Sequence, residues 1–354
     1  MAGPFLAHLF WIHKITEREE IKMRKIKVLL VVVCALTFLW NGSAIAQGAK
    51  PIHLRIAAAG LGSSLYVYAA AIGELLKPHL PQGSTVDILP SPGGVANAIL
   101  VADGRAELAL THSVAARWAN DGTVSFKTKQ ENIRGIVGEM DAYFMAVIVT
   151  KKSGISSIDQ IKEKKFPLRL MTVPVGGNGE IGTRHILESY GMSYEMLKSW
   201  GGSVAHTSRT AITDAMRDGH ADAHIHIATP GHPAISEIAL TTDVRFLPLK
   251  EEIIKTLGNK YGYSKTSIPA KTFKRQDDEV PTIGAPTVLI AAKTLPDEVA
   301  YWTAKVVSEN KAKLVQAHAG LKDFNPEEAW KREKVWTDLH PGAAKYYKER
   351  GWMK

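Results

Sequence analysis

Two glycine-rich turns are the segments of this sequence best suited to holding a small ligand. The first turn comprises Gly60, Gly62, Ser63, Ser64 and Tyr66. Its glycines let the backbone approach a ligand, and the helix predicted after it offers free N–H groups and the positive end of its dipole. The two serine hydroxyls can either cap that helix or donate to a carboxylate. A dinucleotide site is not indicated, because the third glycine and the acidic partner are missing.

The second turn comprises Gly176, Gly177, Asn178, Gly179 and Glu180, and Thr183 follows one turn into its helix. We expect this turn to face the first one across a cleft. Asn97, near the start of another predicted helix, is a third candidate for polar contact with a ligand. It can equally be an ordinary surface residue of that helix.

Both turns belong to one pattern that occurs twice, about 114 residues apart. Each copy has an apolar strand (residues 54–59 and 168–173), the glycine turn, a helix, and later a second helix closed by an Asp-Gly pair. These pairs are Asp103-Gly104 and Asp218-Gly219, and each precedes a short apolar strand. Repeats of this size predict two similar α/β lobes with the ligand at the turns beyond the strand ends.

Histidines form a second candidate site. His224 and His226 alternate along a predicted strand and so point to one face, and His232 follows six residues later. This spacing is compatible with a metal site, with histidines that line a ligand cleft, or with buried structural histidines. His112 and Ser113 stand at the matching place in the first copy.

Residue patterns of known catalytic chemistry are absent from the sequence. It has no Gly-x-Ser-x-Gly elbow, its one cysteine lies in the N-terminal apolar run, and no carboxylate pair has a defined spacing. We therefore expect a binding protein that is not an enzyme and needs no cofactor or resident metal.

The N-terminal region predicts export. From Met23 the chain has a basic segment, an apolar run over residues 28–40, and the sequence Ala44-Ile45-Ala46. This pattern is typical of a signal peptide cut after Ala46, with residues 1–22 as an upstream extension and Met23 as the true start. Cys34 lies inside the apolar run, so we do not expect a lipid anchor.

Composition limits what the mature chain can do. Cleavage removes six basic and three acidic residues, so the net charge falls from +9 to +6, and 308 of the 354 residues remain. No later apolar run is long enough to span a bilayer, which predicts a soluble protein that is not inserted in a membrane. The positive charge is spread along the chain without a nucleic-acid-binding motif, so we expect no nucleic-acid partner.

The order of predicted elements favours two discontinuous lobes. Apolar strands within residues 134–150 and 282–292 would carry the chain to the second lobe and back. The first lobe then comprises residues 47–148 and 285–354, and the second comprises residues 149–284. Strands that alternate with helices favour an α/β architecture of mostly parallel, doubly wound sheets with a ligand cleft between the lobes.

Several motifs in order resemble one known family, the TAXI subgroup of solute receptors that serve tripartite ATP-independent periplasmic (TRAP) transporters. The resemblance covers nearly all of the mature chain. Its motifs lie at residues 60–66, 93–97, 103–107, 176–183, 218–223, 268–273 and 339–351.

The resemblance implies a type II-like periplasmic binding protein whose lobes close on a small solute and deliver it to the TRAP membrane permease subunits. Members favour glutamate-like amino acids or dicarboxylates. Carried onto this sequence, the ligand-binding residues are Gly62, Ser63, Ser64, Tyr66, Asn97, His112, Ser113, Asn178, Gly179, Thr183 and His226.

The chain departs from the family pattern in two places. In the second glycine turn, Glu180 would bring a negative charge beside an anionic ligand, and histidines stand at positions 112, 224 and 226. If these histidines line the cleft, release of the solute should depend on pH. Two rival functions stay open: a receptor that feeds a sensor kinase, and a secreted metal-dependent hydrolase that uses His224, His226 and His232.

Overall fold

Both copies of the repeat form the strand, turn and helix that the sequence predicts. In the first copy, strand β1 (His53–Ala57) leads into helix α2 (Ser64–Leu76), and in the second, β6 (Arg169–Thr172) leads into α6 (Asn178–Ser189). The closing helix and strand of each copy are α3 (Val95–Ala102) with β3 (Leu108–His112), and α8 (Arg209–Arg217) with β8 (Ala223–Ala228).

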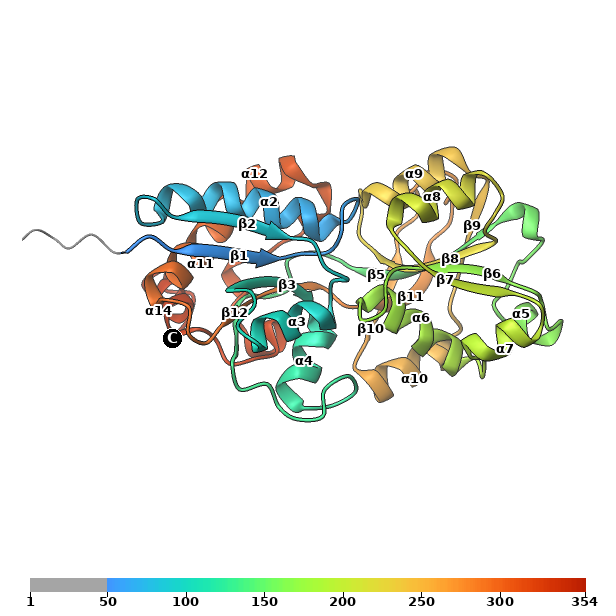
Figure 1. Ribbon diagram of the computed structural model, residues 1–354, viewed down its shortest axis with the longest axis horizontal. Helices are drawn as coiled ribbons and strands as arrows, with labels where there is room; N and C mark the ends of the chain where they lie inside the picture. The colour runs from blue at the N-terminus through green and yellow to red at the C-terminus, as the bar shows by residue number, and fades with distance from the viewer. Residues whose placement is uncertain (1–49) are drawn as a thin grey trace, which may run out of the picture. The chain divides into compact units, whose positions relative to one another are not determined.

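The computed structural model describes residues 50–354, and residues 51–354 form one compact unit (Figure 1). The predicted signal peptide and its upstream extension lie outside the described residues. Across the described part of the chain, none of the helices combines the length and the apolar character needed to cross a membrane.

The first sheet has the strand order β2-β1-β3-β12-β4. Strands β2 (Thr85–Leu89) and β3 flank β1 in parallel, whereas β12 (Thr287–Ala292) runs antiparallel to both β3 and β4 (Ile133–Val137). Helices α2, α11 (Asp297–Glu309) and α12 (Lys311–Ala317) lie on one face, and α3 and α4 (Ser113–Asp121) lie on the other (Figure 1). We refer to this sheet with its helices as the first lobe.

The second sheet has the order β10-β11-β5-β8-β6-β7, with β9 paired to β5. Its remaining strands are β5 (Phe144–Thr150), β7 (Ser203–His206), β9 (Val244–Leu247), β10 (Ser264–Ile268) and β11 (Val280–Gly284). Helices cover both faces, with α8 and α9 (Pro233–Thr241) above and α6, α7 (Tyr194–Ser199) and α10 (Glu251–Tyr261) below in Figure 1. This sheet with its helices is the second lobe.

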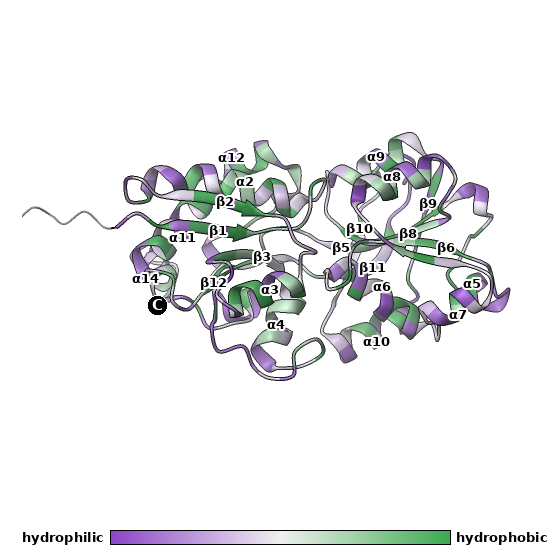
Figure 2. Ribbon diagram, in the orientation of Figure 1, coloured by the Kyte–Doolittle hydropathy of each residue, from purple (hydrophilic) through white to green (hydrophobic). Residues whose placement is uncertain are grey.

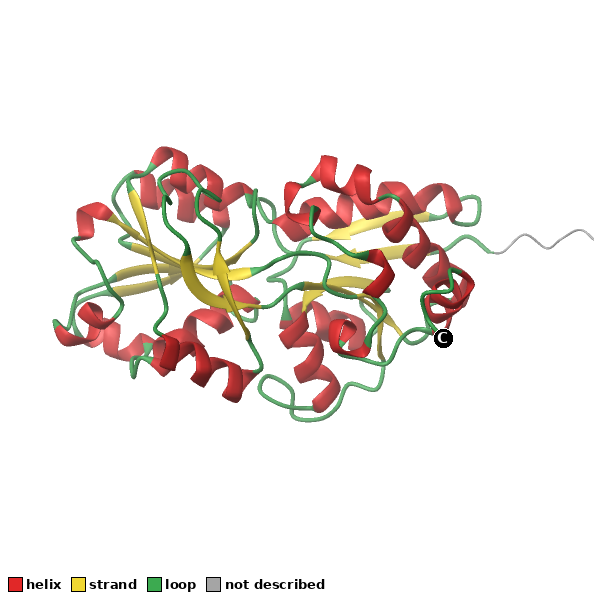
Figure 3. Cartoon of the chain, turned by 180° about the vertical axis from the view of Figure 1, so that it is seen from behind, coloured by secondary structure: helices red, strands yellow, loops and turns green. Residues whose placement is uncertain are grey.

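Short elements complete the described chain. They are η2 (Lys77–His79), η3 (Lys151–Ser153), α5 (Asp159–Glu163), η4 (Ala319–Leu321), η5 (Pro326–Glu328), α13 (Arg332–Val335) and α14 (Pro341–Glu349). The view from behind shows strands enclosed by helices in each lobe (Figure 3).

The chain crosses between the sheets twice. It leaves the first sheet after β4 and enters the second with β5, then leaves the second after β11 and re-enters the first with β12. Each of the two predicted crossover segments therefore holds two strands that belong to different sheets. The α/β class predicted from the sequence is confirmed. The sheets are mixed rather than mostly parallel, because β5, β11 and β12 pair antiparallel with their neighbours. The division into lobes at residues 148 and 284 stays a prediction.

Buried strands form the core. All residues of β3, β5, β8 and β12 are buried, as expected for central strands covered on both faces. Figure 2 shows apolar strands beneath helices whose outer faces are polar.

The same type of ion pair in each copy explains why both copies have an arginine at the start of their first strand. Arg55 donates through Nε and Nη2 to Glu107, and Nη2 also donates to the Gly104 carbonyl at 2.9 Å. Arg169 makes the same set of bonds to Asp222 and to the Gly219 carbonyl at 2.8 Å. The arginine thus joins the first strand of each copy to its Asp-Gly turn and to the start of the next strand.

We predict that Asp222→Asn lowers the free energy of unfolding by about 1 to 3 kcal/mol, because the charge-assisted bonds of Arg169 are lost around a carboxylate that is largely buried. Urea unfolding measures the change. The matched control is Asp338→Asn, which breaks an exposed ion pair with Arg332 and should change stability by less than about 1 kcal/mol. Equal effects of the two variants would contradict the structural role of the Arg169 pair.

Candidate functional site

The second glycine turn meets the segment that leads into α3 directly between the lobes, whereas Gly60 of the first turn lies against Arg209 of the second lobe. Asn178, the first residue of α6, accepts a hydrogen bond through Oδ1 from the Val95 backbone N–H at 3.2 Å. The Ala96 N–H donates to the Gly176 carbonyl, also at 3.2 Å. The predicted cleft is therefore closed, with the ends of helices α3 and α6 in contact.

This approach requires glycine on both sides. Gly94 has a positive φ of 57°, and a Cβ atom at that position would overlap the Asn178 side chain. A Cβ atom on Gly177 would overlap the Pro92 carbonyl. On the second-lobe side, a Cβ atom on Gly179 would overlap the His226 ring, so this glycine lets the imidazole lie close to the start of α6.

A small cavity remains between the turns. Its volume is about 10 Å³, close to the minimum that holds one water molecule. Five of the predicted ligand-binding residues line it: Ser63, His112, Asn178, Gly179 and His226. The other lining residues are Ala59, Leu65, Pro92, Gly93, Gly94, Tyr143, Arg209 and Ile227.

Among the residues that the structure describes, Arg209 is the one charged residue that lines this cavity. It is the first residue of α8, its side chain is buried, and its guanidinium lies against Gly60 of the opposite lobe, 3.5 Å from where a Cβ atom would stand. Within residues 50–354 its side chain forms no ion pair and no hydrogen bond, and its Nε is fully buried without a partner. Burial lowers the pKa of this guanidinium.

Other buried polar atoms around Arg209 also lack partners among the described residues. They are Ser64 Oγ, His112 Nδ1, Asn178 Nδ2, and both ring nitrogens of His226. Buried polar groups in folded proteins are nearly always hydrogen-bonded, so a cluster of unpartnered ones marks a place where a ligand or water supplies the missing bonds. The cluster offers one full positive charge and several neutral groups.

The histidine cluster is not arranged as a metal centre. The ring of His226 lies 5.1 Å from that of His224 and 5.4 Å from that of His232, measured between centroids. Nδ1 of His224 is bonded to the Met171 carbonyl, and Nδ1 of His232 accepts from the Ile235 N–H. Among the described residues, no group of three or more histidines, cysteines or acids is placed to hold a metal ion.

Two predicted binding residues bond to the backbone instead of facing the cavity. Asn97 donates through Nδ2 to the Leu110 carbonyl at 2.6 Å. The Thr183 hydroxyl lies 2.7 Å from the Gly179 carbonyl and 2.9 Å from that of Ile225, which ties the start of α6 to strand β8. Both residues position the walls of the cavity, and neither lines it.

The remaining predicted residues also shape the turns. Ser63 caps α2 by accepting from the Tyr66 N–H, and Tyr66 itself is half-buried outside the cavity lining. Gly62 has a φ of 76°, which favours glycine. Ser113 begins α4, and its N–H donates to the Pro286 carbonyl at 2.8 Å.

Glu180 does not bring its charge to the cavity. Its carboxylate accepts from Arg184 Nε at 2.7 Å and from the Tyr194 hydroxyl at 3.3 Å, and the residue is absent from the cavity lining. The expected negative charge beside an anion is therefore neutralised by an ion pair within α6.

Arg209, Tyr143 and Asp141 were not expected from the sequence. When the two Asp-Gly pairs are aligned, Arg209 falls at the position of Gly94. This replacement of a glycine by a charged residue could have identified Arg209 as a candidate binding residue. Tyr143 lies in the crossing between β4 and β5, with its ring 4.7 Å from that of His112. Asp141 accepts from the N–H and hydroxyl of Thr287, and burial raises its pKa to about 7.

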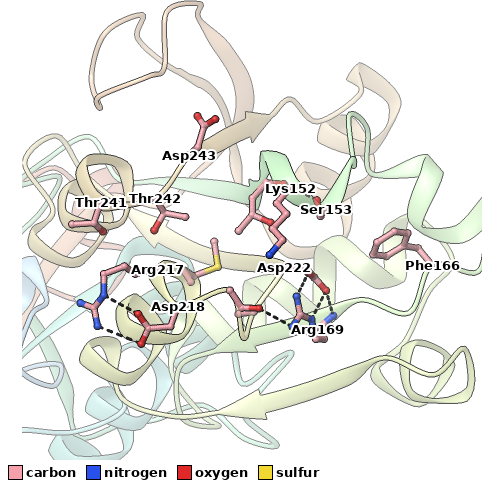
Figure 4. A pocket seen from close by; sticks show the side chains of 14 residues that line it. Lys152, Ser153, Phe166, Arg169, Arg217, Asp218, Asp222, Thr241, Thr242 and Asp243 are labelled. Atoms are coloured by element: carbon pink, nitrogen blue, oxygen red, sulfur yellow. Dashed lines mark hydrogen bonds and ion pairs between the residues drawn. The ribbon is translucent and has the colours of Figure 1, made fainter.

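A larger hollow of about 680 Å³ lies on the second lobe (Figure 4). Its charged residues are largely paired with one another: Arg169 with Asp222, and Arg217 with Asp218 at 3.0 Å. Because its arginines already have acidic partners, this hollow is less suited than the Arg209 cavity to bind an anionic ligand.

An aromatic contact joins the lobes away from the cavity. Trp118 of α4 donates through Nε1 to the Tyr261 carbonyl at the end of α10, at 2.8 Å. His185 of α6 stacks on Tyr261 with ring centroids 3.5 Å apart, and Trp118 meets the edge of that stack. Trp118 is only 2% exposed in this closed arrangement.

Comparison with known proteins gives one family match and many similar folds. The model of the NMT1-like family matches residues 56–351. Among solved structures, the periplasmic binding protein BugD aligns with a TM-score of 0.52 at 15% identity, over 86% of this chain and 99% of that chain.

Two further structures are similar at comparable levels. MatC from Rhodopseudomonas palustris with bound malate has a TM-score of 0.51 at 12% identity, over 85% of this chain and 97% of that one. The binding component of a phosphonate ABC transporter from Pseudomonas aeruginosa has a TM-score of 0.50 at 12% identity, over 77% and 79%. These likenesses show that the chain has the fold of periplasmic binding proteins.

We predict that the protein loses stability when the pH falls from 7 to 5. Burial lowers the pKa of His112 to about 3 and of His224 to about 4, whereas both titrate near 6.5 when unfolded. Below about pH 6.5 the unfolded chain therefore binds protons that the folded chain excludes, which favours unfolding. Asp141 acts in the opposite direction between about pH 4 and 7, but it is one group against several histidines.

Urea unfolding at the two pH values measures this loss, which we expect to be on the order of 1 kcal/mol for each buried histidine. His224→Gln should make the pH dependence shallower. An unchanged free energy of unfolding at pH 5 would show that these histidines are not buried in their neutral form.

We also predict that Trp118→Phe shifts the ligand-free protein toward an open form. The substitution keeps an aromatic ring but removes the bond to Tyr261 that joins the lobes. A larger radius of gyration in small-angle X-ray scattering would reveal the opening. The matched control is Trp330→Phe, which removes a bond of the same type to the nearby Glu327 carbonyl and should leave the radius unchanged.

Proposed function

Because the chain belongs to the NMT1-like family, we propose that it is an extracytoplasmic solute receptor that binds a small carboxylate and delivers it to a TRAP-type membrane permease. The observation that carries the proposal is the buried, unpaired guanidinium of Arg209 in the cavity between the lobes. The predicted signal peptide supports action in the periplasm, and the resemblance to the TAXI subgroup supports the permease partner.

A carboxylate matches the Arg209 guanidinium in charge and in geometry. The guanidinium presents its N–H groups in a planar fork that matches the two carboxylate oxygens. The starts of α2 and α6 lie beside the same cavity and add the positive ends of two helix dipoles. Glutamate-like amino acids and dicarboxylates are the candidate ligands.

The position of the groups links binding to closure. Ser63 and His112 belong to the first lobe, and Arg209 and His226 belong to the second. A ligand that bonds to both sets binds the closed form better than the open form and so shifts the population toward closure. Since the closed cavity holds no more than about one water molecule, the solute must enter while the lobes are apart.

We predict that Arg209→Gln weakens carboxylate binding by at least about a hundredfold while it stabilises the ligand-free protein. The first effect follows from loss of the charge-assisted pair, and the second from removal of a buried charge that lacks a partner. Titration calorimetry with a panel of amino acids and dicarboxylates measures affinity, and thermal unfolding measures stability.

The control for this experiment is Arg217→Gln on the same helix, whose guanidinium is half-exposed and already paired with Asp214 and Asp218. It should leave affinity unchanged. Carboxylate binding that survives in Arg209→Gln would contradict the proposed site, and a wild-type protein that binds no carboxylate would contradict the proposed function.

A further inference from the structure

Helix α3 is capped by a side chain of the opposite lobe. Its own N-cap residue, Gly94, has no side chain to accept a bond from the free N–H groups of the first turn. Asn178 of the second lobe supplies the acceptor, with its Oδ1 3.2 Å from the nitrogen of Val95, the first residue of α3. Helices α2, α7 and α8 are each capped by a serine of their own lobe: Ser63, Ser193 and Ser208. The cap of α3 therefore forms only while the lobes are in contact.

The capping amide is only half satisfied. Asn178 is 3% exposed, and its Nδ2 is fully buried without a partner among the described residues. A buried donor that lacks an acceptor offsets part of the stability that the Oδ1 bond provides. Beside it, the Ala96 N–H is shared between the Gly93 carbonyl of its own lobe and the Gly176 carbonyl of the other. The bonds that hold the lobes together here are thus neutral and incompletely satisfied.

Asn178 also lines the cavity that holds Arg209. That cavity has a volume of about 10 Å³, close to the minimum for one water molecule, and a carboxylate group is larger than a water molecule. A carboxylate at Arg209 therefore requires the walls of the cavity to separate. Gly94 and Asn178 belong to opposite walls, and the Asn178 bond to Val95 joins them. This degree of closure and occupation of the Arg209 site exclude each other.

The exchange of partners favours a carboxylate. Its bonds with the Arg209 guanidinium are charge-assisted and about twice as strong as bonds between neutral groups. Asn178 makes only a neutral bond, from its amide oxygen to a backbone N–H. The cap can therefore hold the lobes together when the solution contains no anionic ligand and still yield when one binds.

We propose that Asn178 is an autoinhibitory contact, which caps α3 from across the cleft and holds the lobes too close together to admit the solute. A carboxylate binds at Arg209 as this cap is released. The inference rests on the proposed function and reverses the role that the family resemblance implies for Asn178. A residue that bonds to the ligand favours binding, whereas this contact opposes it.

The substitution Asn178→Ala separates the two roles by the sign of its effect. We expect glutamate or succinate to bind between about twofold and tenfold more tightly in titration calorimetry, because a neutral hydrogen bond that competes with the ligand is removed. The radius of gyration of the ligand-free protein should increase in small-angle X-ray scattering. Weaker or unchanged binding, or an unchanged radius, would overturn the inference.

Asn178→Asp tests the cap in the other direction with a side chain of the same shape. A carboxylate at this position makes a charge-assisted bond to the start of α3 and places a negative charge on the wall of the Arg209 cavity. We expect the ligand-free protein to unfold at a higher temperature than the wild type, and succinate to bind at least about tenfold more weakly. An unchanged or lower unfolding temperature, or binding at wild-type strength, would also overturn the inference.

Ser193→Ala is the matched control. It removes a helix cap with the same bond length, 3.2 Å from the Met196 nitrogen, but both partners lie within the second lobe. It should change neither the radius of gyration nor the affinity, and an effect equal to that of Asn178→Ala would overturn the inference. A wild-type protein that binds neither glutamate nor succinate would contradict the proposed function, while the scattering of the ligand-free variants still decides whether the cap holds the lobes together.

Discussion

Burial of a guanidinium away from any carboxylate costs several kilocalories per mole in desolvation, and much of this structure is arranged around that constraint. Arg209 projects from the first residue of α8 against the turn that holds Gly60 and Gly62. The histidines around it are kept neutral by burial and by its own charge, which lowers the pKa of His112 and His226. Under the proposed function, a carboxylate ligand is the partner that offsets this electrostatic penalty.

The internal repeat shows which features serve the fold and which serve the site. Both copies keep the arginine that bonds to an acid and to a glycine carbonyl, Arg55 with Glu107 and Arg169 with Asp222. The copies differ where the lobes meet, since the position of Gly94 in the first is taken by Arg209 in the second. The arginines common to both copies therefore stabilise each lobe. Arg209, which occurs in the second copy alone, supplies a charge that two identical copies would not place between the lobes.

Much of the architecture could be predicted from the sequence because it depends on local patterns. The glycine turns, the helices after them and the strands of both crossings follow from apolar periodicity and from caps such as Ser63. The site was only partly predictable. Asn97 and Thr183 have the right chemistry and lie nearby, but their side chains bond to backbone carbonyls. Tyr143 comes to the cavity only through contact between the lobes, which no local pattern encodes. Arg209 stands out in the sequence only when the two copies of the repeat are aligned.

The antiparallel strand β12 has a consequence for the order in which the protein can fold. It lies between β3 and β4 and pairs with both, yet it follows the whole second sheet in the chain. Until residues 287–292 have been synthesised, the first sheet consists of two unjoined parts, while every strand of the second sheet is already present. The second sheet can therefore form early, and completion of the first requires pairing between segments far apart in sequence, which is intrinsically slow. A central strand that comes this late in the chain leaves the first sheet incomplete until most of the chain has been made.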